Sequence, residues 1–162
     1  MLLDVGRRAF LGAFATQNSP ENMKIYMDQA YTLESFQIEL QHPDSFFFML
    51  HGGEQAVGYL KLNIDTAQTD IFDPKALEIQ RIYLLQEYLG NGWGKLMLDE
   101  AERRAFDLGK EYVWLGVWEH NQRAISFYEK HGYQRFSSHS FWLGKDLQTD
   151  LLMKKMLNRD DR

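Results

Sequence analysis

The sequence predicts an α/β fold of the mixed α+β type. Three observations support this prediction. Helix signals dominate up to about residue 42, strand signals begin at residue 45, and the region 76–118 has the order strand, helix, strand. That order normally joins two parallel strands of one sheet. Because the 162 residues contain no repeat and no linker, we expect a single domain over 1–162.

The first part of the chain carries helix spacing and helix-end signals. Phe10 and Phe14 are four residues apart, as one helix face requires. Ser19 followed by Pro20 predicts an N-cap and the first turn of a second helix. A third, short helix is expected over about 33–40, ending before the next proline.

The strand signals are apolar, aromatic or β-branched runs bounded by turn residues. The expected strands are 45–50, 56–64, 76–85 and 112–118, followed by two strands in the tail. The Gly52-Gly53 pair predicts a hairpin turn between the first two. Apolar residues at helical spacing predict a helix that ends at Gly109, and another helix is expected over 121–132 with Asn121 as its N-cap.

Composition excludes several classes of protein. The formal charge is −5, with 23 acidic and 18 basic residues, which argues against nucleic-acid binding. No apolar run approaches the roughly 20 residues of a membrane helix. Arg7 and Arg8 interrupt the N-terminal apolar residues, which is the wrong order for a secretory signal. Without a membrane span or a secretory signal, we expect a soluble cytoplasmic protein, and the absence of cysteine excludes disulfides and is compatible with a reducing compartment.

The segment YLGNGWGKL, residues 88–96, has glycines at 90, 92 and 94 between a predicted strand and a predicted helix. Glycine permits positive φ angles and close approach, so several backbone N–H groups can point at one spot beside the helix N-terminus. Such a site suits phosphate. The alternative is a tight turn without a ligand. The spacing differs from both the Rossmann and the Walker A patterns.

Together with the segment after it, this pattern resembles the GCN5-related N-acetyltransferase (GNAT) superfamily. Gly92 and Gly94 match its Gln/Arg-x-x-Gly-x-Gly/Ala loop, whereas Leu89 stands at the Gln/Arg position. A second motif is matched by Asn121, Ala124, Phe127, Tyr128, Gly132 and Tyr133. The stretches LEIQRIYLL, EYVWLGVWEHNQRAISFYEKHGY and SFWLGKDLQTDLLMKK look most like the bacterial Pai-type spermidine/spermine N-acetyltransferases.

The resemblance implies a GNAT fold, with a central twisted mixed sheet flanked by helices. It also implies that strands 76–85 and 112–118 part at their C-terminal ends and admit acetyl-CoA as co-substrate. The superfamily has a strand before its first helix, whereas this chain begins within that helix. We therefore expect that strand to be missing or its edge of the sheet to be taken by another segment.

The same resemblance assigns the acetyl-CoA site. The diphosphate is expected on the backbone N–H groups of residues 89–95, and the pantetheine arm along 82–84. The expected cofactor-binding residues are Ile82, Tyr83, Leu84, Leu89, Gly90, Asn91, Gly92, Trp93, Gly94, Lys95, Asn121, Ala124 and Tyr128. Two alternatives stay open: Lys95 as a solvated helix residue, and Asn121 as a helix cap alone.

Two residues are expected to be catalytic. The resemblance places Tyr128 beside the sulfur as general acid; the alternative is core packing, as for its neighbour Phe127. Glu78 is the candidate base, since a lone carboxylate in an apolar strand is costly to bury; the alternatives are an exposed strand face or a paired structural carboxylate. Strand alternation predicts Glu78, Gln80 and Ile82 on one face and Arg81 on the other.

The expected reaction is acetyl transfer to a primary amine by direct attack in a ternary complex, with a polyamine such as spermidine or spermine as acceptor. Candidate residues for binding this polycation are Glu119, Trp142, Asp146 and Asp150, each alternatively a turn, surface or core residue. The histidines lack metal-ligand spacing, so no metal is expected. We expect a small-molecule amine as partner, neither nucleic acid nor membrane, and a homodimer as one possible assembly. Two other functions stay open: acetylation of a peptide or protein amine, and a non-catalytic acyl-CoA-binding regulatory module.

Overall fold

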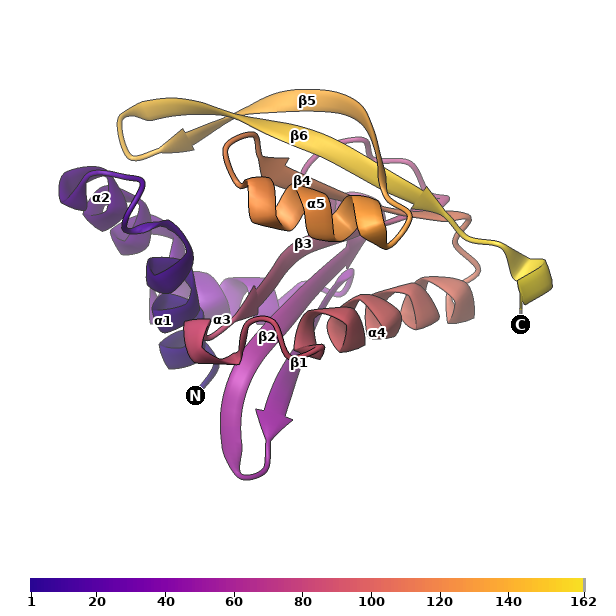
Figure 1. Cartoon of the computed structure of the whole chain (residues 1–162), viewed down its shortest axis with the longest axis horizontal. Coiled ribbons are helices and arrows are strands. Elements are labelled where there is room, and N and C mark those ends of the chain that lie inside the picture. The colour runs from indigo at the N-terminus through magenta and orange to yellow at the C-terminus, as the bar shows by residue number, and fades with distance from the viewer. Residues whose placement is uncertain (162) are drawn as a thin grey trace.

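The computed structural model describes residues 1–161, with helices on both sides of a six-stranded sheet (Figure 1). The helices are α1 (Leu2–Phe14), α2 (Pro20–Ala30), α3 (Leu33–Gln41), α4 (Trp93–Asp107) and α5 (Gln122–Lys130). The strands are β1 (Ser45–Gly52), β2 (Gln55–Ile64), β3 (Ala76–Leu84), β4 (Tyr112–Trp118), β5 (Gln134–Leu143) and β6 (Asp146–Met156). Short 3₁₀ turns cover Asp65–Ala67, Gln86–Tyr88 and Arg159–Asp161.

The strand order is β1-β2-β3-β4-β6-β5, and of the paired strands in residues 1–161 only β3 and β4 run parallel. The mixed fold and its strand–helix–strand unit are therefore as predicted. β1 is an edge strand, so within the described chain no further segment pairs with its outer edge.

Local sequence signals account for the helix starts. The Ser19 side chain accepts a hydrogen bond from the backbone N–H of Asn22 at 3.1 Å, and Asn121 accepts one from that of Ala124 at 3.3 Å. Both predicted N-caps are therefore confirmed. The N-cap of α4 is Gly92, which has no capping side chain, so the N–H groups of the first turn of α4 stay free for another acceptor.

The helices divide between the two faces of the sheet (Figure 1). One core cluster joins Leu60, Leu77 and Leu115 of the sheet with Leu98 of α4 and Ile125 of α5. The other face is covered by α1, α2 and α3, whose buried side chains form one largely aromatic cluster, with Phe10, Tyr31 and Phe36, and one aliphatic cluster, with Val5 and Ala9. Helices from different parts of the chain thus bury the central strands, whereas the edge strand β5 is mostly exposed.

β3 and β4 pair only from Ala76 to Ile79 on β3, and beyond Ile79 the two strands part. At this point β3 also carries a bulge against β2: Leu62 faces Ile79 and Lys61 faces Arg81, which leaves Gln80 as the extra residue.

The bulge reverses the alternation of side chains. Asn63 donates hydrogen bonds to both Glu78 (3.0 Å) and Gln80 (2.8 Å), whereas Ile82 packs into the core cluster under α4. Arg81 turns to the face covered by α3. The prediction that Glu78, Gln80 and Ile82 share a face opposite Arg81 is therefore wrong, because one inserted residue shifts every later side chain to the other face.

Candidate functional site

A cavity of about 1050 Å³ opens where β3 and β4 part. We call its two ends the glycine end, lined by Leu89, Gly90, Gly92, Lys95 and Arg123, and the hairpin end, lined by Phe14, Tyr26, His139, Phe141 and Asp150. The first end lies against the starts of α4 and α5, and the second against α1, α2 and the β5–β6 hairpin. Tyr128, Ile82 and Tyr83 line the cavity as well.

The glycine end is built from backbone. Gly90 and Gly92 have φ angles of 85° and 84°, a left-handed conformation that side-chain-bearing residues rarely adopt. A Cβ added at Gly92 would meet no atom within 4 Å, so the space in front of the α4 N-terminus is open. Free N–H groups and the positive end of a 15-residue helix together favour an anion such as phosphate.

The third glycine has a different role. A Cβ on Gly94 would lie 3.1 Å from the ring of Phe127, so the missing side chain lets α4 and α5 pack closely. The alternate glycines therefore serve two purposes: two of them shape the backbone turn, and one permits helix packing.

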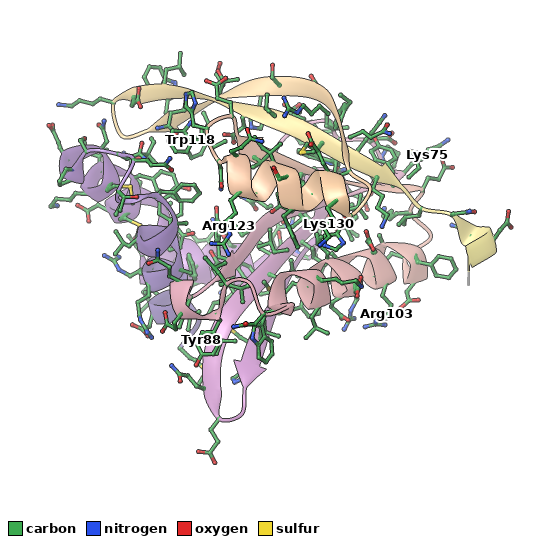
Figure 2. All side chains as sticks on the ribbon, in the orientation of Figure 1. Lys75, Tyr88, Arg103, Trp118, Arg123 and Lys130 are labelled. Carbon is green, nitrogen blue, oxygen red and sulfur yellow. The ribbon has the colours of Figure 1, made fainter. Side chains whose placement is uncertain are left out.

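Cationic side chains surround the glycine end. A Cβ built on Gly90 would lie 3.6 Å from Nη2 of Arg123, and Lys130 also lines the cavity. Figure 2 shows both residues on α5, on the side toward α4 and the segment joining β3 to α4. The expected cation, Lys95, bonds Asp99 at 2.6 Å. Arg123 and Lys130 were not among the predicted residues, although their spacing of seven already places them on one helix face.

All expected cofactor-binding residues except Asn91 and Trp93 line the cavity. The Trp93 ring instead meets that of Tyr88, at 6.4 Å between centroids. Asn121 both caps α5 and lines the cavity, so its two expected roles are compatible. The roles in binding stay predictions.

Tyr128 lines the cavity and is only 7 % exposed. Its ring packs edge-on against Phe127 and Tyr133, whereas its hydroxyl has no hydrogen-bond partner among the residues described. Burial raises the pKa of the Tyr128 phenol, so the hydroxyl is a neutral donor at physiological pH. Packing and donation are thus both available to this residue.

Glu78 is 2 % exposed and lines the cavity. Its carboxylate accepts hydrogen bonds from Asn63 Nδ2 at 3.0 Å and from the backbone N–H of Thr69 at 2.9 Å, as well as from the Thr69 hydroxyl. Burial raises its pKa, and the bonds from Thr69 and Asn63 oppose this shift. The burial of Glu78 excludes the alternative of an exposed strand face. Its surroundings are compatible both with a catalytic base and with a structural carboxylate held by hydrogen bonds.

The hairpin end combines carboxylates with aromatic rings. His139 on β5 lies between two carboxylates, with Nδ1 3.1 Å from Asp70 Oδ2 and Nε2 3.4 Å from Asp150 Oδ2. The hydrogen bond with Asp150, followed by that with Asp70, raises the pKa of His139. Tyr26 and Trp118 line the same end, and carboxylates beside aromatic faces suit a cationic ligand.

Of the four candidate acceptor residues, Asp150 alone lines the cavity as far as residues 1–161 show. Trp142 is 61 % exposed, Asp146 bonds Gln148 Nε2 at 3.1 Å, and Glu119 lies 3.5 Å from His120. His139 and Asp70, which do line the cavity, were missed, because 69 residues separate them in the sequence.

Comparison with known proteins gives a consistent picture. The sequence model of the acetyltransferase (GNAT) family matches residues 11–133. An uncharacterized N-acetyltransferase encoded in the pepI 3′ region of Lactobacillus delbrueckii subsp. lactis is 42 % identical over 153 residues, which are 94 % of this chain and 88 % of that protein. An uncharacterized N-acetyltransferase of Mycobacterium tuberculosis is 29 % identical over 156 residues, 96 % of each chain.

Among solved structures, the PaiA N-acetyltransferase of Thermoplasma acidophilum, crystallised with coenzyme A, superposes with a TM-score of 0.76 at 24 % identity, covering 96 % of this chain and 91 % of that one. At this identity the likeness shows the fold. The chain belongs to the acetyltransferase (GNAT) family, and it is an acyltransferase of the N-acetyltransferase class.

Two further observations bear on the expected partners. None of the helices in the described part of the chain is both long and apolar enough to cross a membrane. Across the same residues, no three histidine or carboxylate side chains come together in a way that would hold a metal ion.

Proposed function

We propose that this enzyme transfers the acetyl group of acetyl-CoA to a primary amine of a small polycation such as spermidine or spermine, by direct attack in a ternary complex. One observation carries the proposal: the glycine end, which suits an anion, and the carboxylate-bearing hairpin end belong to a single cavity, and Tyr128 lines that cavity. Such a cavity suits a donor with a diphosphate and an acceptor with several ammonium groups.

The glycine end fits coenzyme A. The open turn at Gly90 and Gly92 presents backbone N–H groups to the diphosphate, and Arg123 and Lys130 add positive charge beside it. Beyond Ile79, the edge of β3 that faces β4 pairs with no strand of residues 1–161. Its backbone groups at 82–84 are therefore free to pair with the pantetheine arm, and one N–H there is the expected donor to the thioester carbonyl.

The chemistry divides between two side chains. The acceptor arrives as an ammonium with a reference pKa of about 10.4 and must lose a proton, for which Glu78 is the proposed base, acting through water. The amine nitrogen then forms the C–N bond as the C–S bond breaks. Tyr128 donates its proton, or a hydrogen bond, to the departing sulfur; a phenol and a thiol differ by about 1.5 pKa units, or about 2 kcal/mol, in reference pKa.

Recognition of the acceptor is proposed for the hairpin end. Asp150 and Asp70 line the cavity around His139, and a second ammonium group of a polyamine would compete with the imidazole of His139 for their carboxylates. The ring faces of Tyr26 and Trp118 offer cation–π contacts along the same wall. The PaiA protein named above shares the fold and was crystallised with coenzyme A, which bears on the donor and not on the acceptor.

The test is thiol release from acetyl-CoA with a panel of amines: spermidine, spermine, a lysine peptide and a peptide with a free N-terminus. We expect release with the polyamines, and an increase of about tenfold in KM for spermidine on Asp150→Asn, as for loss of a charged hydrogen bond. Asp146→Asn, on the same strand but outside the cavity, is the matched control. Thiol release with the peptides alone would show that the acceptor is a peptide or protein amine and not a polyamine. Binding of coenzyme A without thiol release for any amine would favour the non-catalytic module.

A further inference from the structure

A triad of charged side chains, with both cations buried and the carboxylate partly exposed, lies on the face of the sheet covered by α3, and its member Arg81 also lines the cavity. Glu39 of α3 binds Arg81 through both carboxylate oxygens, with Nη1–Oε2 at 2.8 Å and Nη2–Oε1 at 3.0 Å. Lys61 Nζ bonds the same Oε2 at 2.9 Å. Arg81 is 7 % and Lys61 5 % exposed, so one carboxylate serves two buried cations.

The triad holds β3 at the point where the cavity opens. Arg81 directly follows the bulge residue Gln80, and Lys61 is its partner on β2. The last residue of β3 that pairs with β4 is Ile79. Glu39 therefore binds Arg81, the first regularly paired residue of β3 beyond the bulge, in the part of the strand that no longer pairs with β4.

The triad and the bulge require each other. Without the extra residue, alternation would turn Arg81 into the apolar cluster under α4 and turn Ile82 away from it. A buried guanidinium without a counter-charge is strongly disfavoured. The bond to Glu39 thus favours the bulged register over the straight one.

Among the side chains that the structure describes, no other carboxylate bonds Arg81 or Lys61. Glu78, the other acidic side chain that faces Lys61, is engaged by Thr69 and Asn63. The Arg81 guanidinium also lies over the rings of Tyr31 and Phe36, at 5.6 Å and 5.4 Å, which orient it but carry no full charge.

We propose that Glu39 is a positioning residue for acetyl transfer: through Arg81 and Lys61 it fixes the bulged register of β3 and thereby the place of the free backbone groups of residues 82–84 in the cavity. Glu39 does not line the cavity, so it acts through β3 rather than by touching the substrate. This inference rests on the proposed use of β3 as the donor-binding strand.

The test compares Glu39→Gln with Glu34→Gln, which makes the same change at an exposed position of the same helix. Hydrogen exchange followed by mass spectrometry is the first readout. We expect the amides of residues 80–85 to exchange at least tenfold faster in Glu39→Gln, with the β5–β6 hairpin unchanged. Turnover of acetyl-CoA should fall about tenfold or more, while the KM of the amine stays within twofold. If Glu39→Gln does not fold, Glu39→Asp keeps the charge but is too short to reach both cations, and the same pattern is expected.

Two results would overturn the inference: faster exchange spread evenly over all strands, which marks a purely structural residue, or wild-type exchange at 80–85 with wild-type turnover. The exchange readout needs neither donor nor acceptor. If the proposed amine is not the acceptor, the unmodified enzyme will release no thiol with it. The exchange measurement still tests the role of Glu39 in that case.

Discussion

Replacing Tyr128 with phenylalanine removes one hydroxyl and nothing else. The hydroxyl has no partner among the described residues, and the ring is held by Phe127 and Tyr133. No buried group is left unsatisfied by the change, so we expect the free energy of unfolding to move by less than about 1 kcal/mol. The effect on turnover should be much larger, because the hydroxyl is proposed to act only as the sulfur acquires charge.

The size of that effect follows from the kind of hydrogen bond lost. A hydrogen bond to a charged group contributes about 1.5–3 kcal/mol, and each 1.36 kcal/mol is a factor of ten in rate. Turnover should therefore fall by about 10- to 150-fold, or more if the full proton transfer is lost. Burial raises the pKa of Tyr128, so the phenol stays protonated and this loss should be the same from pH 7 to about pH 9.

Steady-state thiol release gives the turnover number, and calorimetry gives the affinity for coenzyme A. Tyr133→Phe is the matched control, since its hydroxyl bonds Glu102 at 3.3 Å and the residue does not line the cavity. Equal losses of turnover and of coenzyme A affinity in Tyr128→Phe, or no loss of turnover, would refute the assigned role.

Three further changes test other parts of the site. Gly92→Ala imposes a left-handed φ of 84° on alanine, at a cost of about 1 kcal/mol, and should weaken coenzyme A binding several-fold by calorimetry; Gly53→Ala, with a φ of 68° in the β1–β2 turn, should lower stability similarly and leave binding unchanged. His139 has a raised pKa, so its stabilising contribution is full below about pH 6.5 and is lost as pH rises through the folded-state pKa. Urea unfolding of His139→Gln should lack this pH dependence, and an identical profile would contradict it. Gly144→Ala would bring a Cβ within 2.6 Å of Asn22, so we expect a higher KM for the amine with unchanged coenzyme A affinity, and the reverse pattern would count against the hairpin end as acceptor site.

Much of the architecture is encoded locally and was predictable. The N-caps Ser19 and Asn121 bond a backbone N–H only three residues away, so each can be predicted from a short stretch of sequence. The alternate glycines at 90 and 92 likewise predict the left-handed turn that the structure shows. The β3 bulge was not predicted, yet its signal is present. The apolar residues that this strand directs into the cluster under α4 are Leu77 and Ile79, followed by Ile82 and Leu84, so the period slips by one at Gln80.

Other features depend on contacts that no local pattern records. His139 contacts Asp70 across 69 residues of sequence, and Arg81 contacts Glu39 across 42. Neither pair forms a short-range sequence pattern from which the contact could be predicted. Arg123 faces the glycine end only because α4 and α5 cover the same face of the sheet. Strand alternation, applied without a bulge, then assigned Arg81 to the wrong side.

The tip of the β5–β6 hairpin rests on the start of α2 (Figure 1), where the Asn22 side chain accepts a hydrogen bond from the backbone N–H of Lys145 at 2.9 Å and Gly144 leaves no room for a side chain. Segments from opposite ends of the polypeptide thus meet beside the hairpin end, the proposed acceptor site, while the middle of the chain supplies the residues of the glycine end, the proposed site of the diphosphate. If these assignments hold, amino-acid changes where the two segments meet would alter which amine is accepted and leave the binding of the acyl donor undisturbed.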